Sequence, residues 1–460
     1  MTHGNDLGKE PIPVLVLKLA IPTMIAQFVN VLYSIIDRMY IGNIPGEGAL
    51  ALAGVGICGP IVTLLSSFGN LVGLGGSILL AMRMGEGNKK KAEQIMSNSF
   101  LLLIMLSVVL TVAFLILKDK LLMWFGASEV TFVYADAYFK IYTIGTFFAL
   151  MAVGLNYFMT CQGFPKMGML AVLIGAFTNI ILDPIFIFKF NMGVSGAALA
   201  TIIAQFCSCA FSIFFLLSKR PKIRISFGNY SRALMVRIMA MGLSPFLILA
   251  SDSVLIIVLN TVLQRTGGAE ADMLIAAATI VQSYMQLITG PLMGISTGTQ
   301  SIISYNYGAG SSTRLRHAEK FILLMCILFT TIMFIVTRFA AEPFAGIFLK
   351  DADGIRLAGW GIKIFTMAVI PLAFQYALVD GLTALGRTKT ALFLSMFRKI
   401  SYVIIVIIFA FSISARATFY AEPLMDLIAA TVSTIVFLKV FDKHIQKRED
   451  VMRFNKTAII

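Results

Sequence analysis

Charged residues are scarce in this chain. They make up 13% of its 460 residues, whereas a soluble globular protein carries roughly 25%. Hydrophobic residues account for 58%, and the mean hydropathy is +0.88. Because a water-soluble fold of this length has too little interior to bury so much apolar surface, the composition predicts that a lipid bilayer surrounds the chain.

Histidine and cysteine are also rare, which narrows the available chemistry. The three histidines lie outside every long apolar segment, so neither a histidine metal centre nor a His-Glu metalloenzyme is expected. The five cysteines show neither zinc spacing nor a secreted disulfide framework. We interpret them as small buried apolar residues. No cofactor is expected.

The formal net charge is +14, a value that also occurs in proteins that bind nucleic acids. Basic residues crowd the cytoplasmic loops of membrane proteins, and this explanation fits an apolar chain better. No nucleic-acid partner is therefore expected, and the lipid bilayer is the expected partner.

Long apolar segments fill most of the chain. A membrane span needs about 20 apolar residues, each adding 1.5 Å of rise. The polar N-terminus MTHGNDLGKEPIP has no signal-peptide core, so the first apolar segment is a true span. Twelve spans are predicted, at residues 14–41, 49–82, 93–117, 131–158, 167–188, 194–218, 233–263, 273–306, 318–338, 355–385, 389–413 and 419–441.

Lysine and arginine concentrate in every second loop, counted from the N-terminus, and in the C-terminal tail. Cytoplasmic loops carry such an excess. The pattern predicts a multi-pass protein of the inner (plasma) membrane with both termini in the cytoplasm. The longest of these basic loops, residues 219–237, separates the sixth span from the seventh.

The two halves of the chain match at one fixed offset of 223 residues. The matching pairs include Pro22 with Pro245, Gly75 with Gly298, Gly85 with Gly308 and Gly163 with Gly386. Six spans per repeat give both halves the same topology, which predicts two parallel six-helix repeats with a substrate cavity between them. The expected domains are an N-lobe at 1–218, a basic cytoplasmic linker at 219–237, and a C-lobe with a basic tail at 238–460.

Two aspartates stand inside spans of the first half. Asp37 lies in span 1, and Asp183 lies in span 5, one helical turn after Asn179. Ionisable residues within a membrane usually face the interior and serve function. Carboxylate, amide and hydroxyl oxygens suit Na⁺, and a buried carboxylate also suits proton carriage. Asn156 in span 4 and Thr201 in span 6 are isolated polar residues, and hydrogen bonding to a neighbouring helix is the simpler interpretation of each.

The polar chemistry of the second half is different. Asn260 stands at the repeat position of Asp37, and Tyr402 at that of Asn179. Cation coupling is therefore expected in the first half. Candidates for the lining of the substrate cavity are Gln27, Asn30, Tyr33, Gln205, Asp252, Asn260, Gln282 and Asp380.

Several segments together resemble the multidrug and toxic compound extrusion (MATE) family, and the resemblance covers nearly the whole chain. They are AIPTMIAQFVNVLYSIIDRMYIG in span 1, TNIILDPIFIF in span 5, GVSGAALATIIAQ at span 6, SIISYNYGAG ending span 8, and ALGRTKTA after span 10. The resemblance implies a V-shaped pair of six-helix lobes. It also implies a monomeric antiporter that exports small amphipathic organic cations in exchange for H⁺ or Na⁺.

The resemblance also implies roles for individual residues. The family's N-lobe cation site falls here on Asp37, Asn156, Asn179, Asp183 and Thr201. If sodium is the coupling ion, Asp37 and Asp183 would be its carboxylate ligands. The family's span 1 proline, at which that helix bends, falls on Pro22. Asp252 takes the place of a second-lobe acid of sodium-linked members, but their span 10 acid has no clear match, since Asp380 lies nearer the cytoplasmic end.

Two other functions remain open at this point. One is a lipid-linked precursor flippase of the same superfamily, which would need a cationic cavity to hold pyrophosphate. The few arginines in the central spans disfavour it. The other is a membrane-embedded enzyme, which is disfavoured because no catalytic cluster lies near the interface.

Overall fold

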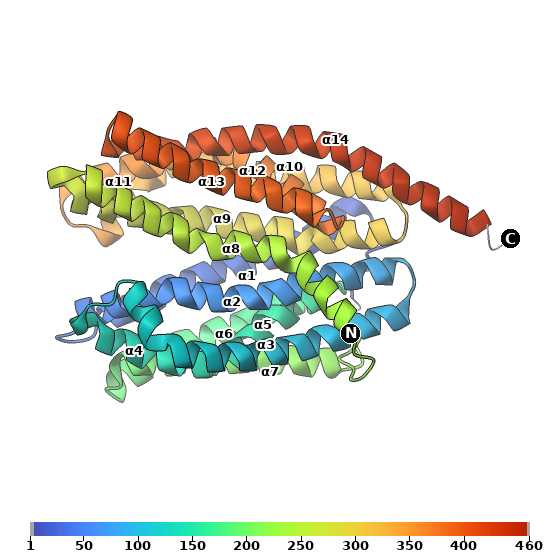
Figure 1. The fold of residues 1–460 in the computed structure, drawn as a ribbon, viewed down its shortest axis with the longest axis horizontal. Coiled ribbons are helices and arrows are strands. Elements are labelled where there is room, and N and C mark those ends of the chain that lie inside the picture. Colours follow the sequence, from blue (N-terminus) through green and yellow to red (C-terminus); the bar gives the residue numbers. More distant parts are fainter. Residues whose placement is uncertain (1–3, 458–460) are drawn as a thin grey trace.

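The computed structural model describes residues 4–457, except for the side chains of residues 49, 253, 447 and 451–457. Residues 1–3 and 458–460 of the predicted lobes lie outside this part. All regular structure in the described part is helical (Figure 1). Eleven of its helices are long and apolar enough to cross a membrane, and one bent helix pair provides a twelfth span. The prediction of an all-α protein with twelve transmembrane helices is confirmed.

The first half of the chain forms seven helices. They are α1 (Ile12–Gly42), α2 (Gly48–Gly85), α3 (Lys89–Trp124), α4 (Glu129–Ile144), α5 (Thr146–Thr160), α6 (Pro165–Pro184), followed by the π-helix η1 (Ile185–Lys189), and α7 (Gly193–Leu217).

The second half also forms seven helices. They are α8 (Arg232–Thr266), α9 (Ala271–Gly308) after the short η2 (Gly268–Glu270), α10 (Ser312–Phe348), α11 (Ala352–Phe365), α12 (Val369–Ala384) after η3 (Thr366–Ala368), α13 (Thr388–Ser412), and α14 (Ala421–Thr457) after η4 (Ala415–Tyr420).

The fourth span of each half is broken in the middle. The axes of α4 and α5 differ by 57° at Gly145, and η3 separates α11 from α12 up to Ala368. Gly145 and Ala368 stand 223 residues apart, which is the offset found in the sequence. A Cβ at Gly145 would collide with the side chain of Ile202 on α7. The helix break is thus a shared feature of both repeats.

The apolar interior consists of two clusters of side chains that follow the two halves of the chain. At one end of the bundle the halves interlock, because equivalent helices cross over. Leu15 and Leu19 of α1 pack into the core of the second half, and Ile238 and Met241 of α8 pack into the core of the first. The N-terminal segment and the C-terminal part of α14 also pack at this end. We call it the terminal end, and we call the opposite end the far end.

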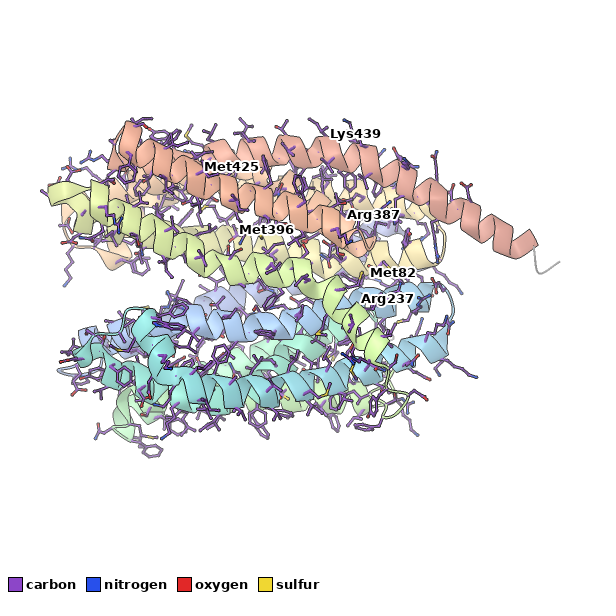
Figure 2. The ribbon with its side chains drawn as sticks, in the orientation of Figure 1. Met82, Arg237, Arg387, Met396, Met425 and Lys439 are labelled. Atoms are coloured by element: carbon purple, nitrogen blue, oxygen red, sulfur yellow. The ribbon has the colours of Figure 1, made fainter. Side chains whose placement is uncertain are left out.

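Glycines bring the lobes into backbone contact at the terminal end. A Cβ on Gly75 of α2 would collide with the carbonyl oxygen of Ile238, and one on Gly242 of α8 with that of Leu71. Figure 2 shows Met82 and Arg387 from the two lobes at the same end. Toward the far end of α2, Gly56 has nothing within 4 Å of its Cβ position. The closest backbone contacts between α2 and α8 therefore lie on the side of the terminal end.

Candidate functional site

Two carboxyl groups face each other near the far end of the first lobe. Helix α1 packs against α6, which brings the Asp37 carboxyl group within hydrogen-bonding reach of that of Asp183. Asp183 is completely buried, and Asp37 is partly buried. Pro184 ends α6, and the π-helix η1 follows directly, so this carboxylate lies where the regular helical hydrogen-bond pattern changes.

An amide and a hydroxyl group complete the cluster. The Nδ2 atom of Asn179 donates to Oδ1 of Asp183 at 3.2 Å and to Oγ1 of Thr201 at 3.4 Å. Helices α6 and α7 pack side by side, which places Thr201 against Asn179. The predicted residues Asp37, Asn179, Asp183 and Thr201 are therefore brought together.

Several oxygen atoms in this cluster have no hydrogen-bond donor. They are Oδ1 of Asp37, Oδ2 of Asp183 and Oδ1 of Asn179, all buried. Two carboxylates within hydrogen-bonding reach of each other repel strongly when both are ionised, unless a proton or a cation lies between them. Oxygen-only donors of this kind suit a hard cation such as Na⁺. The arrangement can therefore hold either a proton or a sodium ion.

Aromatic residues of α4 lie beside the cluster, and sequence reasoning missed them. Tyr138 and Tyr142 stack with their ring centroids 6.0 Å apart. Tyr138 lies near Asp37, and Tyr142 lies near Tyr33. The Tyr142 hydroxyl accepts a hydrogen bond from Nε2 of Gln205 at 3.3 Å and lies 3.5 Å from the hydroxyl of Ser66. Their four-residue spacing within a predicted span was the available signal, because it places both rings on one helix face.

Asn156 lies apart from the cluster. Its Nδ2 atom donates to the carbonyl oxygen of Gly168 at 2.8 Å. Gly168 precedes Asn179 by eleven residues on α6, which is about 16 Å along the helix. The structure therefore does not bring Asn156 to the carboxyl pair, and its contact is the helix–helix hydrogen bond expected for a lone asparagine.

Other predicted cavity residues are dispersed over both lobes. Tyr33 lies beside Asp37, and Asn30 donates to Gln27 at 3.5 Å. Oδ1 of Asn260 is buried without a partner, and Gln282 is partly buried on α9. Pro22 is buried inside α1, which runs as one helix through it.

Span 11, which is α13, carries two basic residues. They bear on the argument that the central spans have too few cations to hold a pyrophosphate. Arg398 binds Glu422 at 2.5 Å and Asp426 at 2.7 Å, and Lys399 pairs with Asp252. Lys399 is buried, whereas half of the Asp252 side chain is exposed. Both cations are neutralised by acids of the same lobe, so neither is free to hold a pyrophosphate.

Comparison with known proteins agrees with this architecture. The MatE family model matches residues 22–185 and 246–411, one segment in each half. The chain is 26% identical over 374 residues to the multidrug export protein MepA of Staphylococcus haemolyticus, covering 81% of each chain.

Two solved structures are also similar. One is a multidrug resistance MATE family transporter of the MOP superfamily in an outward-facing conformation, with a TM-score of 0.89 and 24% identity over 98% of this chain and 99% of that chain. The other is a MOP superfamily transporter from Pyrococcus furiosus, with a TM-score of 0.90 and 24% identity over 96% of this chain and 99% of that chain. These two likenesses show the fold.

Proposed function

The chain belongs to the MatE family of membrane transporters, and from this premise we propose that it is a multidrug antiporter, which exports small amphipathic organic cations in exchange for H⁺ or Na⁺. A member of this family is a transporter and not an enzyme. The similar staphylococcal proteins are named multidrug export proteins, which supports the substrate class proposed here.

The facing carboxyl groups of Asp37 and Asp183 carry the proposal. When the site is empty, their mutual repulsion and the orphaned oxygens nearby disfavour the packed arrangement. A proton or Na⁺ removes that penalty and stabilises the lobe conformation in which the two groups meet. Coupling requires only that the ion and the drug prefer different conformations of the lobes.

The way the lobes pack supports alternating access. We assign the terminal end to the cytoplasm, since the basic loops and both termini lie there. The close backbone contacts at Gly75 and Gly242 would close that end, which supports a conformation that opens away from the cytoplasm. In this state the N-lobe site would take up the coupling ion from outside, and the drug would leave.

The second lobe would supply the charge that holds the drug. Asp252 is half exposed and carries Lys399 as its counter-ion. An organic cation that enters between the lobes would compete with Lys399 for this carboxylate. The protein would act as a monomer in the plasma membrane, since one chain contains both lobes.

The test is efflux of a cationic dye from proteoliposomes, with a pH gradient and a Na⁺ gradient imposed separately. Asp37→Asn and Asp183→Asn are each expected to abolish gradient-driven efflux, because an amide cannot take up a proton or give Na⁺ a charged ligand. Asp353→Asn is the matched control, because its carboxylate is exposed in an ion pair far out on α11. If both site variants keep full gradient-driven efflux, this site does not couple transport.

A further inference from the structure

A second unpaired carboxyl group lies in the other lobe, at the opposite end of the bundle. Glu319 of α10 is 4% exposed, and neither of its carboxyl oxygens has a hydrogen-bond partner. It stands seven residues after the start of α10, about 10 Å from the terminal end. Asp37 stands five residues before the far end of α1. The two groups therefore lie toward opposite membrane surfaces.

The surroundings of Glu319 form a space for a carboxyl group but provide no cation. A Cβ at Gly381 on α12 would lie 2.5 and 2.7 Å from the two carboxyl oxygens, so the glycine leaves room for the carboxyl group in this position. Among the described residues, no ion pair includes Glu319, whereas the partly buried Glu422 and the fully buried Asp426 both bind Arg398.

Asp380 is the acidic neighbour of Glu319. Ser296 and Gln300 of α9 lie within hydrogen-bonding reach of its carboxyl group. Other titratable groups near the pair are Cys326 on α10 itself, Tyr376 on α12, and Tyr157 of α5, which lies near Asp380 from the first lobe. None of these neighbours supplies a positive charge to Glu319.

An ionised carboxylate in this position would be a buried charge without a partner, beside a second acid. A buried, unpaired charge is strongly unfavourable in a protein interior, and the group avoids that state by taking up a proton. The protonated form also restores a donor next to an acceptor-rich neighbour. We infer that Glu319, beside Asp380, is a second proton-binding site of this transporter, in the C-lobe near its cytoplasmic end.

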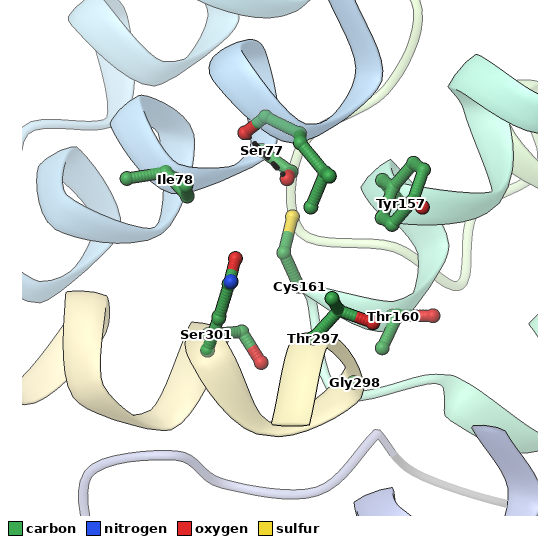
Figure 3. Close-up of a pocket in the computed structure, with 10 residues that line it drawn as sticks. Ser77, Ile78, Tyr157, Thr160, Cys161, Thr297, Gly298 and Ser301 are labelled. Atoms are coloured by element: carbon green, nitrogen blue, oxygen red, sulfur yellow. Dashed lines mark hydrogen bonds between the residues drawn. The ribbon is translucent and has the colours of Figure 1, made fainter. Parts of the chain in front are cut away.

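The boundary between the lobes gives this site a route to the cytoplasm. Gln300, which binds Asp380, also lines a cavity of about 10 Å³ between the lobes, the room of about one water molecule. Figure 3 shows this cavity with Ser77 and Tyr157 of the first lobe opposite Thr297 and Ser301 of α9. When the lobes separate at the terminal end, water reaches Gln300 and then Asp380. Glu319 would then release its proton to the cytoplasm.

The role of Glu319 in transport rests on the proposed function, but its protonation can be measured without a transport assay. Infrared spectroscopy of the purified full-length protein in lipid nanodiscs detects the carbonyl stretch of a protonated carboxyl group. We expect the wild-type protein at pH 7 to show a band that Glu319→Gln removes and that Asp353→Asn leaves in place. An unchanged band in Glu319→Gln, or a band lost when Na⁺ is added at constant pH, would overturn the inference.

A second measurement avoids substitution in the buried site. Labelling all glutamates with ¹³C in the wild-type protein shifts the carbonyl stretch of a protonated glutamic acid and leaves that of a protonated aspartic acid in place. A shifted band supports a protonated glutamate; if no carboxyl band shifts, Glu319 carries no proton and the inference fails. This result stands whether or not Glu319→Gln folds.

Transport then separates the two sites. Glu319→Gln is expected to lower pH-gradient-driven efflux roughly 5- to 150-fold, the range that coupling free energies cover, while dye binding at zero gradient persists. If Asp37→Asn and Asp183→Asn both leave efflux intact, the proposed N-lobe coupling fails, but the infrared band still decides whether Glu319 carries a proton. Full pH-driven efflux in Glu319→Gln would remove this residue from coupling.

Discussion

Arg448 of α14 donates through Nη2 to Oε1 of Glu86 at 2.7 Å, which ties the last helix of the C-lobe to the loop between α2 and α3 of the N-lobe. The same guanidinium group donates to the carbonyl oxygen of Gly308 at 3.2 Å and lies over the ring of Tyr307. The C-terminal helix therefore holds the two lobes together at the terminal end.

This ion pair predicts a pH-dependent contribution to stability. Burial opposes the charge of Glu86, but hydrogen bonds from Arg83 and Arg448 outweigh it and hold its pKa below the ordinary 4.5. The contribution is complete above pH 4.5 and is lost as the pH falls through the lower pKa of the folded state. Glu86→Gln should lower the free energy of unfolding by about 1–3 kcal/mol at pH 7. It should also reduce the acid sensitivity of the thermal melting temperature.

The control for this prediction is Asp353→Asn, which removes an exposed acid whose pair with Arg356 lies in water. Exposed pairs contribute little to stability, so its melting curve should match that of the wild-type protein. An equal acid sensitivity in Glu86→Gln and wild type would show that the Arg448 contact does not stabilise the packed end.

The first-lobe site predicts different effects for its two asparagines. Asn179→Leu removes the amide that binds both Asp183 and Thr201, so gradient-driven efflux should fall by tenfold or more, about 1.4 kcal/mol of lost coupling. Asn156→Leu breaks only the bond to Gly168 and should retain most of the efflux. Equal losses in the two variants would place Asn156 in the coupling site after all.

Backbone contact between the lobes predicts a conformational effect of a single methyl group. In Gly75→Ala, the new Cβ meets the carbonyl oxygen of Ile238, so the terminal end cannot close fully. The distance between spin labels on α2 and α8 at this end should increase. Gly56→Ala on the same helix has open space at its Cβ position and should leave the distance unchanged. A closed terminal end in Gly75→Ala would contradict this account.

The charge cluster of the second lobe predicts a large loss of stability from one substitution. Arg398→Met leaves Glu422 and Asp426 without their cation; the latter is fully buried. Removal of one partner from a buried ion pair typically costs roughly 3–5 kcal/mol. Thermal unfolding in detergent should show it. Arg356→Met, in a pair with both side chains exposed, should unfold like the wild type. Similar melting temperatures for both variants would refute the structural role.

The number and place of the spans were readable from the sequence. Bilayer thickness requires about 20 apolar residues per helix, and this length rule operates on each segment separately. The predicted segment 131–158 shows where local reasoning stopped. The sequence predicted the span but not its 57° bend. The bend occurs at Gly145, where the side chain of Ile202 on α7 leaves no room for a Cβ, and only tertiary packing brings Ile202 near.

The membership of the candidate site needed the tertiary structure. Residue type and helical spacing placed Asn179 and Asp183 on one face of one helix, but Asp37 meets Asp183 only because α1 packs on α6. The same packing directs Asn156 to Gly168 instead. Neighbouring helices also decided which charges have partners: Arg398 is neutralised by α14, and Glu319 is left alone.

The sequence by itself determined the spans, the repeat and the presence of acids in the membrane, because these depend on segments of the chain taken one at a time. Only the packing of distant helices decided which acids face each other, since a side chain's partners depend on what lies beside it in space.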